Sequence, residues 1–251
     1  MIARLALLLF VLLLLPAAAF AGAPAECLTA QHEVERTFPL PQVQRAVAAK
    51  KLDVLVVGSG SSTLPGRGGA SGAYPARLQR ALTELLPGVT VTVATDVKPH
   101  RLAVAAVETL KAALKTAKPN LVIWQAGTVD AIQSVDPDQF SDALEQGIAL
   151  VRAAGADLIL VNAQYSPRTE SMIALTTYAD DMRMVALQHE VPLFNRFDIM
   201  KLWADLGTFD FTSPSNKLDM AKRVHNCVGW LLAGLVIEAA KPTAPPTEGG
   251  R

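Results

Sequence analysis

The sequence predicts a three-layer α/β fold, in which a parallel five-stranded sheet is covered by helices on both faces. Apolar runs alternate with amphipathic segments along most of the 251-residue chain. Five runs have the length of strands, at residues 52–57, 89–94, 121–124, 158–161 and 192–194. Strands in strict alternation with helices form a parallel sheet with helices on its faces. We therefore expect one α/β domain over residues 52–240.

The first strand is almost entirely apolar and mostly β-branched, which is typical of a strand buried on both faces. It leads directly into the turn GSGSST at residues 58–63. The two glycines permit a tight turn, and Ser59, Ser61 and Ser62 supply hydroxyls that can act as a nucleophile, bind an anion or cap the turn. Glycine and serine are ordinary turn residues, so the turn alone does not establish a site.

The segments between the strands have the apolar spacing of amphipathic helices. We place the helices at residues 74–86, 102–117, 137–153, 169–188, 199–206 and 218–239. In a parallel sheet of this kind, ligands bind where the loops leave the carboxyl ends of the strands. Functional residues are therefore expected directly after the strands.

Polar side chains occupy those positions. Gln125, Gly127 and Asp130 follow the third strand, and Asn162 and Gln164 follow the fourth. Because the carboxyl ends of parallel strands meet at one edge of the sheet, we expect these groups to share a rim.

Two histidines are candidates for a base at this rim. His225 lies in the last predicted helix, which can bring it to the same edge of the sheet. His100 follows the second strand and is the alternative base. The structural alternative for His225 is a helix histidine that is satisfied by a nearby carbonyl group.

The two ends of the chain have compositions of their own. Residues 1–21 carry Arg4, an apolar run and a small-residue cleavage pattern, which together predict a secretory signal peptide. A membrane anchor would need about 20 apolar residues, and this run is shorter. We expect a periplasmic or secreted product without a stable membrane anchor after cleavage. Residues 22–51 are expected to form an N-terminal arm and residues 241–251 a disordered tail.

Charge and cysteine content limit the classes of partner. The 23 basic and 23 acidic residues balance, which argues against nucleic acid as a partner. Cys27 and Cys227 could pair in an oxidising compartment and pin the arm to the last helix, or remain as two buried thiols. They do not make a zinc site, and no phosphate loop, dinucleotide fingerprint or metal cluster is present, so no cofactor or metal is expected.

Four segments in order resemble the SGNH or GDSL hydrolases. They are GSGSST after the first strand, WQAGTVDA after the third, QYSP after the fourth and VHNC in the last helix. The similarity extends over residues 52–239 and is to an exported branch of that family found in alphaproteobacteria. It implies a flavodoxin-like three-layer fold. It also implies that acyl esters are hydrolysed or transferred by a serine nucleophile, a histidine base and oxyanion donors.

The resemblance assigns roles to individual residues. Counting back from Thr63, it implies that Ser61 is the nucleophile, with Ser59 and Ser62 as alternatives. It implies that His225 is the base, which Asp219 would orient if the last helix begins late.

Oxyanion donors are also implied. Backbone N–H groups of the serine turn and of the third strand's loop would hold the oxyanion, and nearby side chains could add donors: Gly60, Ser62 and Gly127, then Gln125, Gln164 or Asn162. Asp130 is a further candidate for binding at the rim, and its simpler role is to cap a helix.

Three positions differ from the family pattern. Val129 stands where the family has an asparagine that donates to the oxyanion, and Lys222 stands where it has the acid of the triad. No glycine follows the second strand. The loss of one oxyanion donor lowers a rate by about a hundredfold to a thousandfold.

Two functions follow from these observations. The first is an exported serine esterase or acyl hydrolase that acts on small acyl esters or O-acylated envelope glycans. The alternative is a catalytically weakened protein of the same fold that binds a glycan or a partner protein through the same rim.

Overall fold

The computed structural model describes residues 22–34, 38–212, 215 and 217–241. The expected signal peptide and all but the first residue of the expected tail lie outside these residues.

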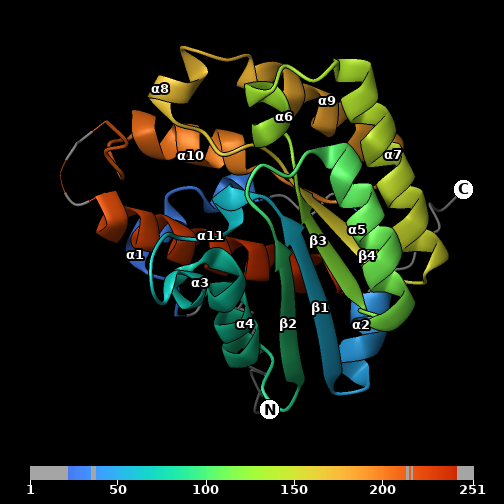
Figure 1. Ribbon diagram of the computed structural model, residues 1–251. Helices are drawn as coiled ribbons and strands as arrows, with labels where there is room; N and C mark the ends of the chain where they lie inside the picture. Colours follow the sequence, from blue (N-terminus) through green and yellow to red (C-terminus); the bar gives the residue numbers. More distant parts are fainter. Residues whose placement is uncertain (1–21, 35–37, 213–214, 216, 242–251) are drawn as a thin grey trace, which may run out of the picture.

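The core of the fold is a parallel sheet of five strands in the order β2-β1-β3-β4-β5. The strands are β1 (Lys51–Gly58), β2 (Thr90–Val97), β3 (Leu121–Gln125), β4 (Asp157–Val161) and β5 (Leu193–Phe194). Each corresponds to one predicted strand, so the predicted sheet is confirmed. Figure 1 shows the carboxyl ends of the strands directed toward α6 (Thr128–Ile132) and α8 (Pro167–Glu170).

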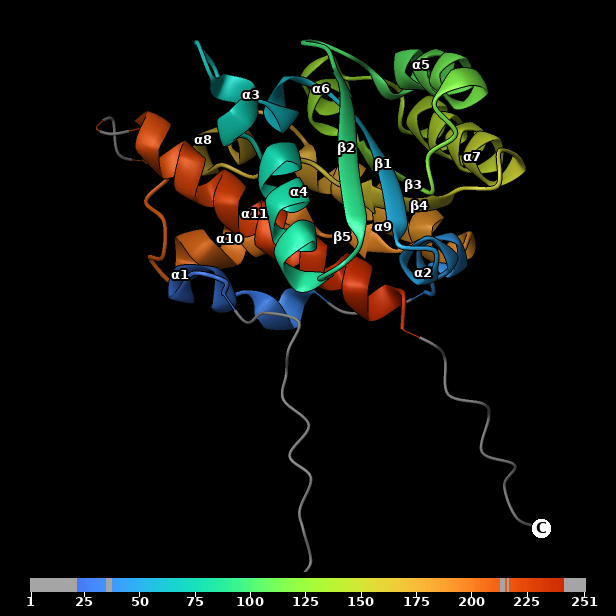
Figure 2. The ribbon, with the colours of Figure 1, turned by 90° about the horizontal axis from the view of Figure 1, so that it is seen from below.

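Helices cover both faces of the sheet (Figure 2). One layer contains α4 (Tyr74–Leu85) and α11 (Lys217–Ala239), and the other contains α5 (Ala103–Thr116) and α7 (Pro137–Ala153), with α9 (Leu175–Gln188) packed against α7. The three-layer α/β/α prediction is therefore confirmed.

Two glycines let the helix layers pack closely. A Cβ on Gly229 of α11 would lie 2.5 Å from the Cβ of Arg77 in α4. A Cβ on Gly147 of α7 would lie 2.1 Å from the ring of Trp124 in β3. Because neither Cβ fits, larger residues at these positions would push the helices away from their neighbours.

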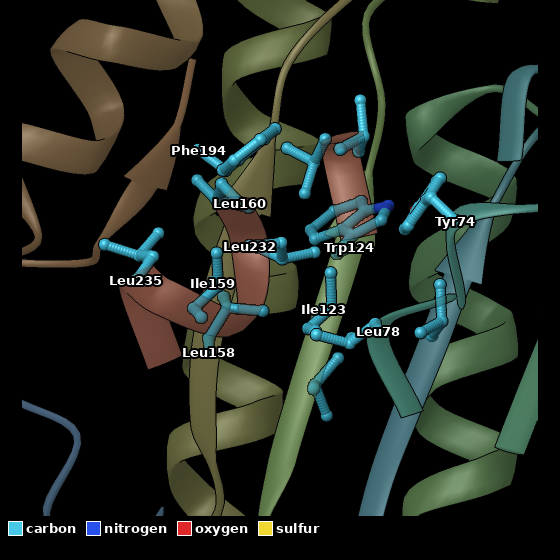
Figure 3. Packing of buried hydrophobic residues seen from close by; sticks show 14 of the residues in the cluster. Tyr74, Leu78, Ile123, Trp124, Leu158, Ile159, Leu160, Phe194, Leu232 and Leu235 are labelled. Carbon is cyan, nitrogen blue, oxygen red and sulfur yellow. The ribbon is translucent and has the colours of Figure 1, made fainter. Parts of the chain in front are cut away.

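Buried aliphatic and aromatic side chains fill the space between the layers. Figure 3 shows side chains of β3 and β4, Ile123 and Leu158 among them, close to side chains of α11 such as Leu232. Each such side chain stabilises the fold by about 1.5–3 kcal/mol when it is fully buried. This packing fixes the strand ends that form the rim.

The N-terminal segment before the sheet contains helices that the sequence analysis did not predict. They are α1 (Ala25–Leu28), the 3₁₀ helix η2 (Gln31–Glu33) and α2 (Pro41–Ala48). Asp157, at the start of β4, accepts hydrogen bonds from the backbone N–H groups of Gln42 and Val43 at 2.7 and 2.8 Å. A carboxylate at a helix N-terminus is favourable, so this contact holds α2 against the sheet.

Two other segments differ from the expected helices. The helix predicted over 169–188 is divided into α8 and α9, and α10 (Arg196–Asp205) begins three residues earlier than expected. The short helices η3 (Gly60–Ser62), α3 (Gly69–Gly72) and α6 lie in loops.

A disulfide joins Cys27 in α1 to Cys227 in α11. The pairing predicted from the sequence is therefore confirmed, and the alternative of two free thiols is wrong. An ion pair between Glu26 and Arg223 lies beside it.

Candidate active site

Three serine hydroxyls at the end of β1 converge on one acceptor. The side-chain oxygen of Gln125, the last residue of β3, lies 3.0 Å from the Oγ atoms of Ser59, Ser61 and Ser62. The backbone N–H of Ser59 also donates to it at 3.1 Å. A carbonyl oxygen has two lone pairs, so it cannot hold all four donors at once.

The three serines differ in exposure. Ser59 and Ser62 are 3% and 1% exposed, whereas Ser61 is half-buried. Ser61 is therefore the most exposed of the three serines. This arrangement requires Gly58, because a Cβ there would lie 2.3 Å from the Oγ of Ser62.

A second network connects this turn to α11. Ser62 Oγ lies 3.1 Å from the hydroxyl of Tyr74, and the backbone N–H of Tyr74 donates to Nδ1 of His225 at 2.9 Å. The two rings are stacked with centroids 6.0 Å apart. His225 is thus linked to the turn through Tyr74, and within the described residues no hydrogen bond joins it to a serine.

His225 is held neutral. Its side chain is 4% exposed, and burial, together with the nearby charge of Arg196, lowers its pKa to about 3. Because Nδ1 accepts a hydrogen bond, the proton of the neutral ring is on Nε2. In this tautomer Nε2 donates a hydrogen bond and cannot accept the proton of a serine.

Asp219 does not orient His225 in this structure. The last helix begins at Lys217, so both residues lie within it, six positions apart. Asp219 is exposed and pairs with Lys222 at 3.2 Å, while Nδ1 of His225 is occupied by Tyr74. The predicted triad acid is therefore wrong, because the helix starts too early for the two side chains to meet.

Asp130 is a structural cap and not a binding group. It is 1% exposed, and its carboxylate accepts from the N–H groups of Ala103 and Gly127 at 2.8 and 3.0 Å. Burial raises its pKa despite these hydrogen bonds. The N–H of Gly127 is thus already paired, which corrects its expected role as an oxyanion donor. Val129, beside it on α6, is buried.

The backbone donors expected in the serine turn differ in availability. The N–H of Ser62 donates to the carbonyl oxygen of Ser59 at 2.9 Å, so it is not free for an oxyanion. Gly60 is exposed at the first position of η3. His100, the alternative base, lies exposed in the loop after β2.

Two amides of the β4 loop hold neighbouring elements. Asn162 is fully buried, accepts from the N–H of Phe197 at 2.9 Å and donates to Asn195 at 2.7 Å. The side-chain oxygen of Gln164 accepts from Arg196 at 2.9 Å, and the backbone N–H of Gln164 donates to the hydroxyl of Thr128. Both therefore stabilise the rim, and the side-chain NH₂ of Asn162, which was expected as a possible oxyanion donor, already donates to Asn195.

Arg196 is a site residue for which the sequence analysis gave no role. Its guanidinium is fully buried and donates through Nη1 to the carbonyl oxygen of Ser61 at 2.9 Å and through Nη2 to Gln164. Its Cζ lies 5.8 Å from the ring centroid of Tyr74. Burial lowers its pKa to about 10. In the sequence, a role for Arg196 is indicated by its position two residues after the end of β5.

A groove of about 460 Å³ begins at the serine turn and runs between α4 and β2. None of its lining residues is charged, and all but the amide Gln79 are small, apolar or hydroxyl-bearing: Ser62, Thr63, Ala70, Ser71, Ala73, Pro75, Ala76, Gln79, Val93, Thr95 and Val97. The groove can hold an uncharged group beside the turn.

Neither a metal centre nor a membrane span is found in the described part of the chain. No group of three or more His, Cys, Asp or Glu side chains there is arranged to hold a metal ion. No helix there combines the length and the apolar character that crossing a bilayer requires.

Comparisons with known proteins give a family match. The sequence profile of the non-GDSL lipase-like family matches residues 26–242. Among curated protein sequences, none matches the chain significantly.

Several solved structures share the fold. A lipase/acylhydrolase from Enterococcus faecalis aligns with a TM-score of 0.57 at 19% identity, over 77% of this chain and 100% of the other. TesA aligns with a TM-score of 0.56 at 22% identity, over 72% of this chain and 99% of the other. An acetyl-xylooligosaccharide esterase from Geobacillus aligns with a TM-score of 0.51 at 16% identity, over 76% and 95%.

Proposed function

Because this chain belongs to the non-GDSL lipase-like family of ester-bond hydrolases, we propose that it hydrolyses carboxylic esters with Ser61 as the nucleophile. The observation that carries the proposal is the set of three serine hydroxyls on Gln125, of which that of Ser61 belongs to the most exposed residue. Since Gln125 Oε1 cannot satisfy every donor, the Ser61 hydroxyl can leave this acceptor at little cost.

The proposed reaction has two halves. Ser61 Oγ attacks the ester carbonyl carbon, a serine ester forms, and the bond to the alcohol breaks. The proton of the serine passes through a base to the departing alkoxide. Water then attacks the acyl-serine, which releases a carboxylic acid and restores the hydroxyl of Ser61.

Two groups can serve as the base. His225 can do so after its ring proton moves to Nδ1, which requires that the contact with Tyr74 be released. Solvent hydroxide is the other. With a pKa of about 3, His225 is neutral at neutral pH, so a reaction through His225 is independent of pH between about 5 and 8. A reaction through hydroxide rises about tenfold per pH unit.

The proposed substrate is an uncharged acyl ester, either small or attached to a glycan of the cell envelope. The groove beside the serine turn has no charged lining residue, which favours a neutral ligand. The acetyl-xylooligosaccharide esterase has the same fold, which is compatible with an O-acylated sugar. Export to the periplasm or beyond is part of the proposal, and it is supported by the Cys27–Cys227 disulfide and by the composition of residues 1–21.

A second function is favoured by the same geometry. The neutral His225 and the paired N–H of Gly127 leave Ser61 without a hydrogen-bonded base or that oxyanion donor. A protein that binds an acylated glycan or a partner at the rim without cleaving it would have these features.

Labelling of the protein with a fluorophosphonate, followed by peptide mass spectrometry, separates the two functions. Label on Ser61 that is lost in Ser61→Ala and kept in Ser59→Ala supports the hydrolase. If the folded wild-type protein takes up no label at any serine and releases no alcohol from p-nitrophenyl acetate, the binding function replaces it.

A further inference from the structure

We propose that Arg196 is a positioning residue of the serine site, which holds the turn at Ser61 and makes the potential there positive. The proposal rests on the proposed function, because it concerns the reactivity of the same hydroxyl.

The contacts of Arg196 link three elements at the rim. From the first turn of α10, its two terminal nitrogens reach the carbonyl oxygen of Ser61 after β1 and the side chain of Gln164 after β4, each at 2.9 Å. The guanidinium lies over the ring of Tyr74, whose backbone N–H binds His225. Arg196 therefore touches the nucleophile's own peptide and, through Tyr74, the candidate base.

The charge of Arg196 is not explained by stability. Within the described residues no carboxylate forms an ion pair with it, and its Nε is buried without a hydrogen-bond partner. It also lies at the N-terminal end of α10, where the helix dipole disfavours a cation. A buried cation without a counterion is costly, so a neutral hydrogen-bond donor of similar size would fold at least as well.

The positive charge of Arg196 has opposite effects on the two groups of the proposed reaction, Ser61 and His225. A positive charge beside Ser61 favours negative charge on the attacking oxygen and on the oxyanion that follows. It disfavours a proton on His225, which faces the same guanidinium. Arg196 thus partly replaces the oxyanion donor that Val129 cannot supply.

The test compares Arg196→Met, Arg196→Gln and Arg196→Lys by the rate constant of fluorophosphonate labelling at Ser61 and by the thermal midpoint. Arg152→Met, which removes an exposed arginine of α7, is the matched control. We expect Met and Gln to lower the labelling rate by at least about tenfold, because a neighbouring charge changes ionisation by about that factor or more. Lysine should recover most of the rate, the control should match wild type, and the thermal midpoint of Gln, which can still donate a hydrogen bond, should not fall.

The pH profile gives a second readout that a purely structural role would not change. In the neutral variants the labelling rate should rise at a higher pH than in the wild type, since the serine loses its neighbouring charge. If Arg196→Met does not fold, the comparison of Gln with Lys carries the test.

The proposal is overturned if a folded neutral variant is labelled within about twofold of the wild-type rate, or if Lys is as slow as Gln. These outcomes require that the wild-type protein is labelled. Absence of label on the wild-type protein contradicts the proposed function instead.

Discussion

The loops after β1 and β3 lie at the same rim of the sheet, but their polar groups are satisfied in opposite ways. After β3, Asp130 gives one carboxylate oxygen to each of two backbone N–H groups, so donors and acceptors match. After β1, three hydroxyls and one N–H compete for the single oxygen of Gln125. The loop after β3 is therefore a closed cap, whereas the loop after β1 retains a hydroxyl that its acceptor does not fully hold. At this rim, an excess of hydrogen-bond donors over acceptors therefore distinguishes the proposed site from the cap.

The largest expected effect concerns the buried histidine behind the β1 loop. The pKa of His225 is lowered from 6.5 to about 3, so the unfolded chain binds a proton that the folded chain refuses. The unfolding free energy therefore keeps the full contribution of His225 above pH 6.5. This contribution is lost as pH falls toward 3, by about 4–5 kcal/mol in total. Urea unfolding from pH 7 to 3 should show this loss, and His225→Gln should flatten it. If the unfolding free energy falls with pH equally steeply in the wild type and in His225→Gln, the ring of His225 is not held neutral.

Removal of the cap in the β3 loop should have the next largest effect. Asp130→Ala leaves two buried N–H groups without an acceptor, which costs about 2–4 kcal/mol of unfolding free energy. The control Asp138→Ala changes an exposed acid in the first turn of α7. A loss below about 0.5 kcal/mol would mean that solvent or another group replaces the carboxylate.

Gln125→Ala should cost less, although Gln125 receives twice as many donors. Ser62 keeps its contact with Tyr74, and Ser61 can turn to solvent, so we expect a loss of about 1–2 kcal/mol. The comparison between the loops fails if Gln125→Ala destabilises the protein more than Asp130→Ala does in the same urea titration.

The smallest effect is the titration of Asp130 itself. Burial raises its pKa above 3.8, so its contribution to stability is full below that pH and declines as pH rises through the raised pKa. The difference in unfolding free energy between wild type and Asp130→Asn should therefore decrease across that window. An increase would show that the two N–H donors outweigh burial.

The sequence predicted the sheet and most helices because buried strands and amphipathic helices have local periodicities. It did not predict α2, a short helix whose N-terminus is fixed by Asp157, more than a hundred residues away. The division between α8 and α9 was missed because the apolar spacing continues across it.

The candidate site was predictable only in part. The turn and His225 were found by type and order, whereas the tautomer of His225 depends on the N–H of Tyr74, 151 residues distant. Arg196 was missed for the same reason, since an arginine after a strand has no local sign that it is buried. Asp219 was misassigned because the start of the last helix decides which face it occupies.

The Cys27–Cys227 disulfide bears on how the protein is made. Its cysteines are 200 positions apart, near the start and the end of the domain. During synthesis the first cysteine waits without its partner until nearly the whole chain has emerged. Oxidation can therefore lock only a nearly complete chain, and a truncated chain that lacks α11 would keep Cys27 without its disulfide partner.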